Sequence, residues 1–266
     1  MAKPVALTIA GSDPSGGAGI QADLKTFHQF GVYGEAVLTL LTVQNTVTVA
    51  AVETLDPDFV QRQLEAVLSD IPPQAAKTGA LGDGAMIEMI ADAAERFTFP
   101  LVVDPVMISK HGAPLIAEEA RGLLAKLLMP RAFLITPNLH EASALVGFAV
   151  ETAEAMRQAA VQLRGMGARA VLIKGGHLEG TALDVLCTED GVFHDYPGER
   201  YDTVHTHGTG CTYSAAITAC LAMGMPLPEA VGAGKRYIGE AIRTNPGLGH
   251  GAGPVNHHAR GIVEKP

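Results

Sequence analysis

The sequence has no tryptophan, and aromatic residues make up only 5% of its 266 positions. Hydrophobic residues nevertheless account for 47% of the chain. This balance, rich in alanine, valine, leucine and glycine, suits a large core of parallel strands and packed helices. The length allows either one large α/β domain or two small ones.

Cysteine is also scarce, with Cys187, Cys211 and Cys220 as its three occurrences. Their odd number and the lack of Cys-x-x-Cys spacing disfavour a disulfide framework and a structural zinc site, and favour a reducing compartment. Cys220 stands in an apolar stretch with helical character, where a small thiol packs like a hydrophobic residue. We interpret both Cys220 and Cys187 as core residues.

Positively charged residues are fewer than negatively charged ones. The chain has 19 Lys and Arg residues and 28 Asp and Glu residues, which gives a net charge of -9. This balance argues against non-specific nucleic-acid binding, although a small phosphorylated ligand needs only local positive groups or a metal ion. Long apolar runs are missing too. The N-terminal run in MAKPVALTIAG is too short to span a membrane and lacks the layout of a signal peptide. We expect a cytoplasmic protein without nucleic-acid or membrane partners.

Strands and helices are predicted to alternate along nearly the whole chain. Expected strands lie at residues 5–10, 36–43, 101–104, 133–135 and 170–173, with a weak edge strand at 47–52 and a hairpin of 181–187 and 191–196. Residues 75–83 are expected to form a short strand that leaves into a turn. Expected helices lie at 20–30, 59–68, 86–97, 118–128, 140–146, 152–166, 212–223 and 227–244. With no linker or repeat, the pattern predicts a single α/β domain over 1–266, a mostly parallel sheet with helices on both faces.

The glycine-rich stretch GSDPSGGAG at residues 11–19 resembles a nucleotide-binding loop but fails both common patterns. A P-loop needs Lys-Ser/Thr after its last glycines, where this chain has Ala18 and Gly19. The dinucleotide fingerprint fails because no third glycine follows at Ile20, Gln21 or Ala22. The residue pattern of this loop therefore gives no reason to assign it to phosphate binding.

The polar residues that end the expected strands should share one cleft, because ligands bind beyond the carboxyl ends of parallel strands. These residues are Gln44, Lys77, Asp104, Asn138, Lys174 and the loop before Cys211. Lys174, beside two glycines, can approach phosphate as a point charge. Asp104 before Pro105 can be either a turn residue or part of a metal or phosphate site.

The segment HTHGTGCTYSAA at 205–216 is the strongest candidate for chemistry. Gly208-Thr209-Gly210 permits a sharp turn close to a ligand, and a helix starting near Gly210 would direct free N–H groups at an anion. A thiol at Cys211 would then have a lowered pKa. The alternative is a tight turn into a buried helix with a structural cysteine.

Asn138 and Glu141 stand three residues apart at an expected helix start. Both can face one spot, and an amide oxygen and a carboxylate suit Mg²⁺ directly or through water. The alternative is an ordinary helix N-terminus. His205, His207, His257 and His258 lack metal-ligand spacing, and we interpret them as surface or backbone-capping residues.

Together these motifs give the sequence a family resemblance. ALTIAGSDPSGGAGIQADLKTF, VQNT, DPVM, TPNLHEA, KGGH, THGTGCT and GHGAGP occur in order from Ala6 to about Pro254. They resemble the hydroxymethylpyrimidine/phosphomethylpyrimidine kinases of thiamine biosynthesis, which belong to the ribokinase superfamily. The resemblance implies a ribokinase-like fold and two successive phosphorylations with ATP and Mg²⁺, of 4-amino-5-hydroxymethyl-2-methylpyrimidine and then of its monophosphate. It also implies a homo-oligomer, with a dimer favoured.

The resemblance also implies roles for individual residues. The pyrimidine pocket would be lined by Ala18, Asp23, Gln44, Ala80, Val106 and Cys211. Asp104, Lys174 and Thr209 would lie on the nucleotide and phosphate side, Asn138 and Glu141 near magnesium, and Gly208, Thr209 and Gly210 would form the anion hole. Cys211 would stand at the substrate hydroxyl, and residues 108–114 would form a flap.

The chain departs from its relatives at two of these positions. Many members of the superfamily carry an aspartate base where this chain has Cys211, and the cysteine is typical of the pyrimidine kinases. Ala80 stands where relatives often present methionine, which leaves extra room beside the substrate. A pyridoxal/pyridoxine kinase is therefore an alternative. A nucleotide-binding oxidoreductase is disfavoured by the missing fingerprint, and a non-catalytic metabolite-binding protein by the retained Lys174, Asn138 and Glu141.

Overall fold

The computed structural model describes residues 3–107, 116, 118–176, 178 and 182–259. Its centre is a nine-stranded sheet in the order β3-β2-β1-β4-β5-β6-β7-β8-β9. The strands are β1 (Val5–Ser12), β2 (Tyr33–Gln44), β3 (Val49–Thr54), β4 (Ala75–Thr78), β5 (Leu101–Val103), β6 (Leu134–Ile135), β7 (Ala170–Lys174), β8 (Asp184–Cys187) and β9 (Phe193–Tyr196).

Six strands that are neighbours in the sheet pair in parallel, in the order β2, β1, β4, β5, β6 and β7. The antiparallel pairings, of β3 with β2 and of β8 with β7 and β9, lie at the two edges of the sheet. The chain adds β2 and β3 on one side of β1, then returns to place β4 and its successors on the other side. Such a reversal leaves a crevice beyond the carboxyl ends of the strands. The alternation of short apolar runs and helices in the sequence correctly predicts this α/β architecture.

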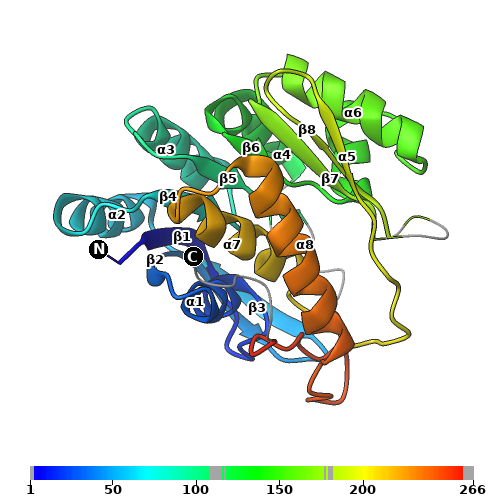
Figure 1. Ribbon diagram of the computed structural model, residues 1–266. Helices are drawn as coiled ribbons and strands as arrows, with labels where there is room; N and C mark the ends of the chain where they lie inside the picture. The colour runs from blue at the N-terminus through cyan, green and yellow to red at the C-terminus, as the bar shows by residue number, and fades with distance from the viewer. Residues whose placement is uncertain (1–2, 108–115, 117, 177, 179–181, 260–266) are drawn as a thin grey trace.

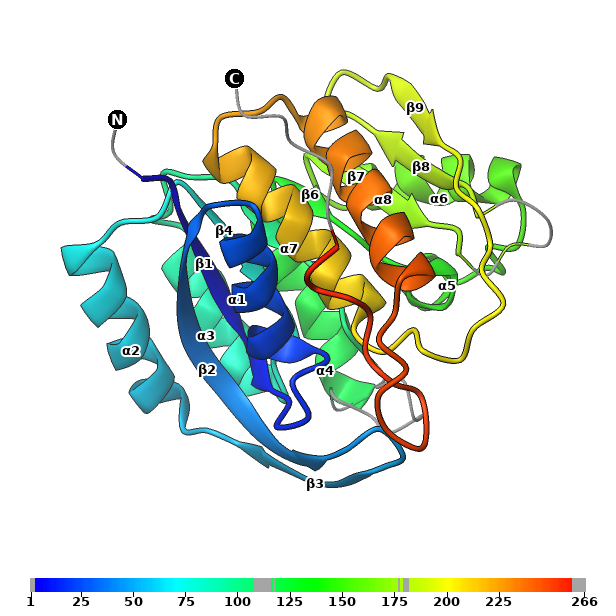
Figure 2. The same cartoon turned by 60° about the horizontal axis from the view of Figure 1, so that its bottom comes forward.

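Helices cover both faces of the sheet (Figures 1 and 2). One face carries α1 (Gly19–Gln29), α7 (Thr209–Ala222) and α8 (Leu227–Arg243), which contact one another. The other carries α2 (Pro57–Asp70), α3 (Gly84–Ala94), α4 (Glu118–Leu123), α5 (Leu139–Val146) and α6 (Ala153–Gly165). Each layer encloses its own apolar core because a parallel sheet must be covered on both sides.

Helix α7 is the most enclosed helix of the described chain, and every residue from Thr212 to Ala222 is buried. Its small residues let it lie against the sheet, with α1 on one side of it and α8 on the other (Figure 2). A helix that is apolar around its whole circumference belongs in a core. The position of α7 fixes the loop that precedes it against the end of the sheet.

The predicted helix over 118–128 is confirmed, but it is α-helical only in its first half. The α-helical turn ends at Leu123, a π-helical turn follows over Leu124–Leu128, and a 3-10 turn closes the segment at Met129–Arg131. Pro130 lies in that last turn and has no N–H to continue an α-helix. The 108–114 flap and the first residue of the predicted 181–187 strand lie outside the described residues. No helix in the described part of the chain is long and apolar enough to cross a bilayer.

Candidate active site

A cavity of about 1030 Å³ opens at the carboxyl ends of the parallel strands. It brings together most of the residues that the sequence predicts to share a cleft. Its lining includes Ala18, Gln44, Ala80, Asp104, Val106, Asn138, Glu141, Lys174 and the segment from Gly208 to Cys211. These residues come from seven different segments, so the site depends on the parallel packing of the sheet.

Two glycine-rich loops meet at the floor of this cavity. Gly208 has a φ of +78°, a left-handed conformation that favours glycine. A Cβ atom at Gly208 would lie 1.7 Å from the carbonyl oxygen of Gly17, so no other residue fits there without moving the backbone. Helix α7 begins at the next residue, Thr209, and its first N–H groups are therefore available to an anion.

An ion pair lies directly beside this helix start. Lys174 Nζ donates to Asp104 Oδ1 at 2.9 Å, and Thr136 Oγ1 donates to the same oxygen at 3.1 Å. A Cβ atom at Gly210 would lie 3.4 Å from Lys174 Nζ, which places the ammonium against the glycine turn. Burial, the largest single influence, raises the pKa of Asp104, but the charges of Lys174 and Lys77 and the hydrogen bonds from Lys174 and Thr136 together leave that pKa below its ordinary value.

Asn138 and Glu141 form a capping box at the start of α5. The Asn138 side chain accepts from the Glu141 backbone N–H at 2.9 Å, and Glu141 Oε2 accepts from the Asn138 N–H at 2.8 Å. The ordinary reading of this pair as a helix N-terminus is thus confirmed. Both residues also line the cavity. Burial, the largest influence, raises the pKa of Glu141 to about 7.

Asp23 lies below the cavity rather than in its lining. Its Oδ2 accepts from Lys77 Nζ at 2.8 Å and from Thr8 Oγ1 at 2.6 Å, and both charged side chains are fully buried. The expected place for Asp23 in the pocket lining is wrong because α1 directs this side chain toward the sheet, where Lys77 neutralises it. Asp23 Oδ1 has no hydrogen-bond partner in the structure.

The lowered pKa expected for Cys211 is also wrong. Burial raises the pKa of this thiol to about 12, and the charge of nearby Lys77 only partly opposes that effect. The side chain is half-buried in the cavity wall. In the free protein the thiol is therefore neutral at physiological pH, in spite of its place in the first turn of α7.

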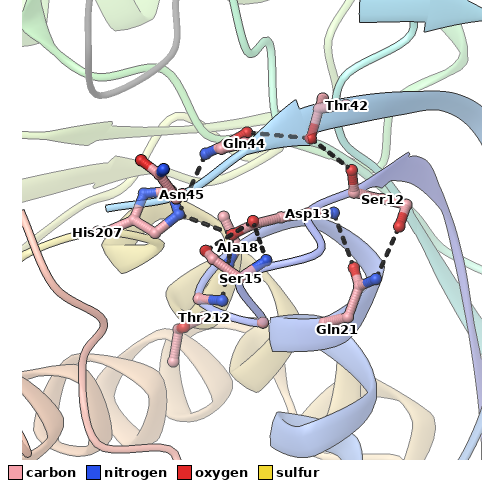
Figure 3. A network of polar contacts seen from close by, with 12 residues as sticks. Ser12, Asp13, Ser15, Ala18, Gln21, Thr42, Gln44, Asn45, His207 and Thr212 are labelled. Carbon is pink, nitrogen blue, oxygen red and sulfur yellow. Dashed lines mark hydrogen bonds and ion pairs between the residues drawn. The ribbon is translucent and has the colours of Figure 1, made fainter. Parts of the chain in front are cut away.

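The glycine-rich loop is held by Asp13, a residue that no sequence motif marks as special. Asp13 Oδ2 accepts from the backbone N–H groups of Gly17 at 3.1 Å and Ala18 at 2.9 Å, and from His207 Nε2 at 2.7 Å (Figure 3). Burial would raise the pKa of Asp13, but its bonds to His207 and Ser15 bring it to about 2.

The expectation that the histidines cap backbone or face solvent is wrong for two of the four. His205 Nδ1 does accept from the Gly253 N–H at 3.1 Å, and His258 is exposed. His207 and His257 are buried. Burial lowers the pKa of His257 to about 4, while its Nε2 lies 3.1 Å from Thr212 Oγ1. Cys187 and Cys220 are buried, as predicted.

Further residues that sequence reasoning missed line the cavity on the side of the 199–203 segment. They are Glu199, Arg200, Tyr201, Asp202 and Thr203, and Arg121 and His140 join them from α4 and α5. The 199–203 segment has no regular secondary structure, so it carries no periodic signal. Its position depends on packing against distant parts of the chain.

A mostly parallel α/β sheet whose carboxyl-edge cavity combines a helix N-terminus with the partly buried Lys174 is the arrangement of a ribokinase-like phosphotransferase. The chain belongs to the phosphomethylpyrimidine kinase family, whose model matches residues 13–256.

Curated relatives carry the same family name. The chain is 44% identical over 264 residues to the hydroxymethylpyrimidine/phosphomethylpyrimidine kinase of Staphylococcus aureus strain Mu50, covering 97% of this chain and 95% of that one. It is 47% identical to the Rhizobium meliloti protein of the same name, covering 96% and 97%. It is 49% identical to the thiamine biosynthesis bifunctional protein ThiED of Geobacter sulfurreducens. That match covers 94% of this chain but spans only 51% of the bifunctional protein.

Solved structures with this fold carry two kinds of name. A phosphomethylpyrimidine kinase from Clostridium difficile 630 is 45% identical with a TM-score of 0.81, covering 90% of this chain and 100% of that one. An ADP complex of Bacillus subtilis pyridoxal kinase is 40% identical with a TM-score of 0.89, covering 97% and 98%. Staphylococcus aureus pyridoxal kinase in complex with AMP-PCP and pyridoxal is 36% identical with a TM-score of 0.88, covering 97% and 95%.

Proposed function

We propose that this protein transfers phosphate from ATP to 4-amino-5-hydroxymethyl-2-methylpyrimidine and then to the resulting monophosphate, as a step of thiamine biosynthesis. The observation that carries the proposal is the composition of one cavity. It holds Gln44, a side chain able to read an aminopyrimidine edge, together with an anion-binding turn and Lys174. The family and the names of the curated relatives support the same substrate.

The pyrimidine would lie against Ala18, Gln44, Ala80 and Val106, which line the same cavity. An amide offers one acceptor and one donor side by side, and an aminopyrimidine edge offers the complement, an exocyclic N–H and a ring nitrogen. Two hydrogen bonds would thus orient the ring. The hydroxymethyl group would then face Cys211 and the start of α7.

Phosphoryl transfer would take place at the turn of Gly208, Thr209 and Gly210. It depends mainly on positioning and on stabilising negative charge, which backbone N–H groups fixed at a helix start provide. Lys174, held against this turn by Asp104, supplies a positive charge for the nucleotide phosphates. The Cys211 thiol is neutral in the free protein, so it would accept the hydroxyl proton only as a thiolate, after its own proton has passed to solvent.

Magnesium would be held near Asn138 and Glu141. One oxygen of each is engaged in the capping box, and the Glu141 carboxyl, with a pKa of about 7, would gain from a neighbouring cation. No group of three or more acidic, histidine or cysteine side chains gathers among the described residues. Such a sparse set fits Mg²⁺, which keeps several waters and binds substrate phosphates as well. When bound, the ion would neutralise charge on those phosphates.

A pyridoxal kinase is the second candidate. The solved structures from Bacillus subtilis and Staphylococcus aureus carry that name, and Ala80 is a small residue in the cavity wall. The test supplies ATP and Mg²⁺ with either the pyrimidine or pyridoxal and compares kcat/KM. We expect the pyrimidine to be preferred. A higher kcat/KM for pyridoxal would overturn the proposal, and turnover of neither would leave a binding protein.

We further propose that the protein works in the cytoplasm on this small-molecule substrate, without nucleic-acid or membrane partners, and that it forms a homodimer. The net charge of -9 supports the first part, because it opposes polyanion binding. The second part is supported by exposed apolar side chains along β2 and β3, including Leu41, Val43 and Val52.

A further inference from the structure

The carboxylate of Asp13 can only accept hydrogen bonds at the pH at which the protein works. Its Oδ1 accepts from the Ser15 N–H at 2.8 Å and the Ser15 hydroxyl at 2.7 Å, and its Oδ2 accepts from two backbone N–H groups. Five donors in total converge on this buried side chain, and the fifth is the ring of His207. A carboxylate surrounded in this way stays ionised.

His207 Nε2 must therefore carry a proton. The nitrogen lies 2.7 Å from Asp13 Oδ2, and an ionised carboxylate oxygen supplies no proton of its own to that contact. This holds whether the ring is neutral or charged. Carboxylate partners fix the tautomer of a histidine in this manner.

In the structure the same ring nitrogen lies 3.3 Å from Gln44 Nε2, and Gln44 Oε1 lies 3.3 Å from Thr42 Oγ1 (Figure 3). A protonated Nε2 has no free lone pair to accept from the amide N–H₂ group, so a half-turn of the amide, which exchanges its oxygen and nitrogen, suits this contact better. Thr42 Oγ1 can give its single proton to the nearer Ser12 carbonyl at 3.0 Å. That hydroxyl can accept from the amide N–H₂ group.

We infer that His207 is a specificity-determining residue that fixes which end of the Gln44 amide is oxygen, and that it thereby selects a substrate with an amino group over one with a carbonyl at the same ring position. The inferred orientation is the reverse of the one in the structure, so that Gln44 Oε1 faces His207 and Gln44 Nε2 faces Thr42. The opposite orientation would set the amide N–H₂ against the His207 N–H, and two donors repel one another.

The inference rests on the proposed function and gives it a mechanism for choosing a substrate. Gln44 Oε1 has a second lone pair for the exocyclic amino group, and Gln44 Nε2 has a second N–H for the ring nitrogen. The 4-oxo analogue presents a carbonyl and a ring N–H instead, in the reverse order. It could pair with Gln44 only if the amide turned over, and the His207 proton opposes that rotation.

The test compares kcat/KM for the 4-amino pyrimidine and its 4-oxo analogue, 5-hydroxymethyl-2-methylpyrimidin-4-one, in the wild-type protein and His207→Leu. We expect the wild type to prefer the amino compound, and the preference to fall by about tenfold or more in His207→Leu, mainly through KM. His207→Gln, whose amide can still donate to Asp13, should keep more of the preference. His257→Leu is the matched control, since His257 is also buried but lies outside the cavity lining.

The outcomes separate the two proposals. If wild-type protein phosphorylates neither pyrimidine, the proposed function fails. If it prefers the amino compound and His207→Leu loses activity on both compounds equally, His207 is only structural and the inference is overturned. A folded variant is confirmed by its circular dichroism spectrum and its thermal transition. If His207→Leu does not fold, Thr42→Val, which removes the other anchor of the amide, decides instead. A fall in the preference supports the inference, and an unchanged preference overturns it.

Discussion

Cys211 shows how burial controls the chemistry of a single side chain. Its place in the first turn of α7 and the nearby ammonium of Lys77 both favour a thiolate. Loss of water outweighs them, and the pKa of the thiol rises to about 12 from its ordinary value of 9.0. The thiol is therefore a weak nucleophile until bound ligands change its surroundings.

The raised pKa of the Cys211 thiol predicts how this residue reacts with iodoacetamide. Only the thiolate is alkylated, so the rate at Cys211 in the free protein should rise about tenfold per pH unit through pH 10 without levelling. Mass spectrometry of the peptide that carries Cys211 gives this rate, and Cys211→Ser is the control for alkylation of the two buried cysteines. A rate that levels off below pH 8 would show that the pKa is lowered after all.

At the scale of one element, α5 shows a helix start that serves both folding and the site. The capping box of Asn138 and Glu141 satisfies backbone N–H groups at the end of the helix. The same residues line the cavity where magnesium is proposed to bind. Stability and ligand binding therefore place opposing demands on the charge of Glu141.

Glu141→Gln should make the protein less sensitive to pH. The pKa of Glu141 in the folded protein, about 7, exceeds its ordinary value of 4.5, so the protonated carboxyl stabilises the fold below pH 4.5 and this contribution is lost as pH rises through 7. Glutamine keeps the capping acceptor and does not titrate. From pH 5 to pH 8, wild type should lose on the order of 2 kcal/mol in free energy of unfolding relative to the variant, measured by urea denaturation.

Magnesium and nucleotide provide the control for this experiment. A cation beside Glu141 favours the carboxylate, so adding both ligands should reduce the pH dependence of wild type and leave the variant nearly unchanged. Parallel pH profiles for the two proteins without ligands would contradict the raised pKa.

Across the whole molecule, the sequence predicts most successfully the positions of residues that directly follow a strand of the parallel sheet. Gln44, Asp104, Asn138 and Lys174 each follow a strand, and parallel strands end at the same edge, so their convergence follows from the order of elements alone. The fold class was predicted for the same reason. That residues 1–266 unfold as a single domain stays a prediction.

Contacts between distant segments could not be predicted. His207 meets Asp13 across 194 positions in sequence, and neither residue lies in a periodic pattern that marks it. Asp23 was misplaced because its distance from the cavity depends on how α1 packs on the sheet, where Lys77 reaches it. The pKa of Cys211 depends on burial, which the residue types around it in sequence do not reveal.

The proposed homodimer gives a prediction at this scale. In the described part of the chain, Val43 has 63% of its surface exposed, on a strand that also exposes Leu41. We expect sedimentation equilibrium to give twice the 27.7 kDa of one chain. Val43→Asp should shift the mass toward that of one chain because a buried charge is unfavourable. Val161→Asp is the control, since Val161 is 56% exposed on α6, away from β2 and β3. A single-chain mass for wild type would contradict the dimer.

The contact between the two glycine-rich loops also sets an order of events during synthesis. Gly208 fits against Gly17 only when α7 is in place, and the His207 backbone bonds to the carbonyl of Gly253 and the N–H of Val255. A ribosome delivers residues 11–19 early and residues 253–255 late. The strands can pair as they emerge, but the floor of the cavity can close only after translation has passed Val255, so a nascent chain holds no complete site.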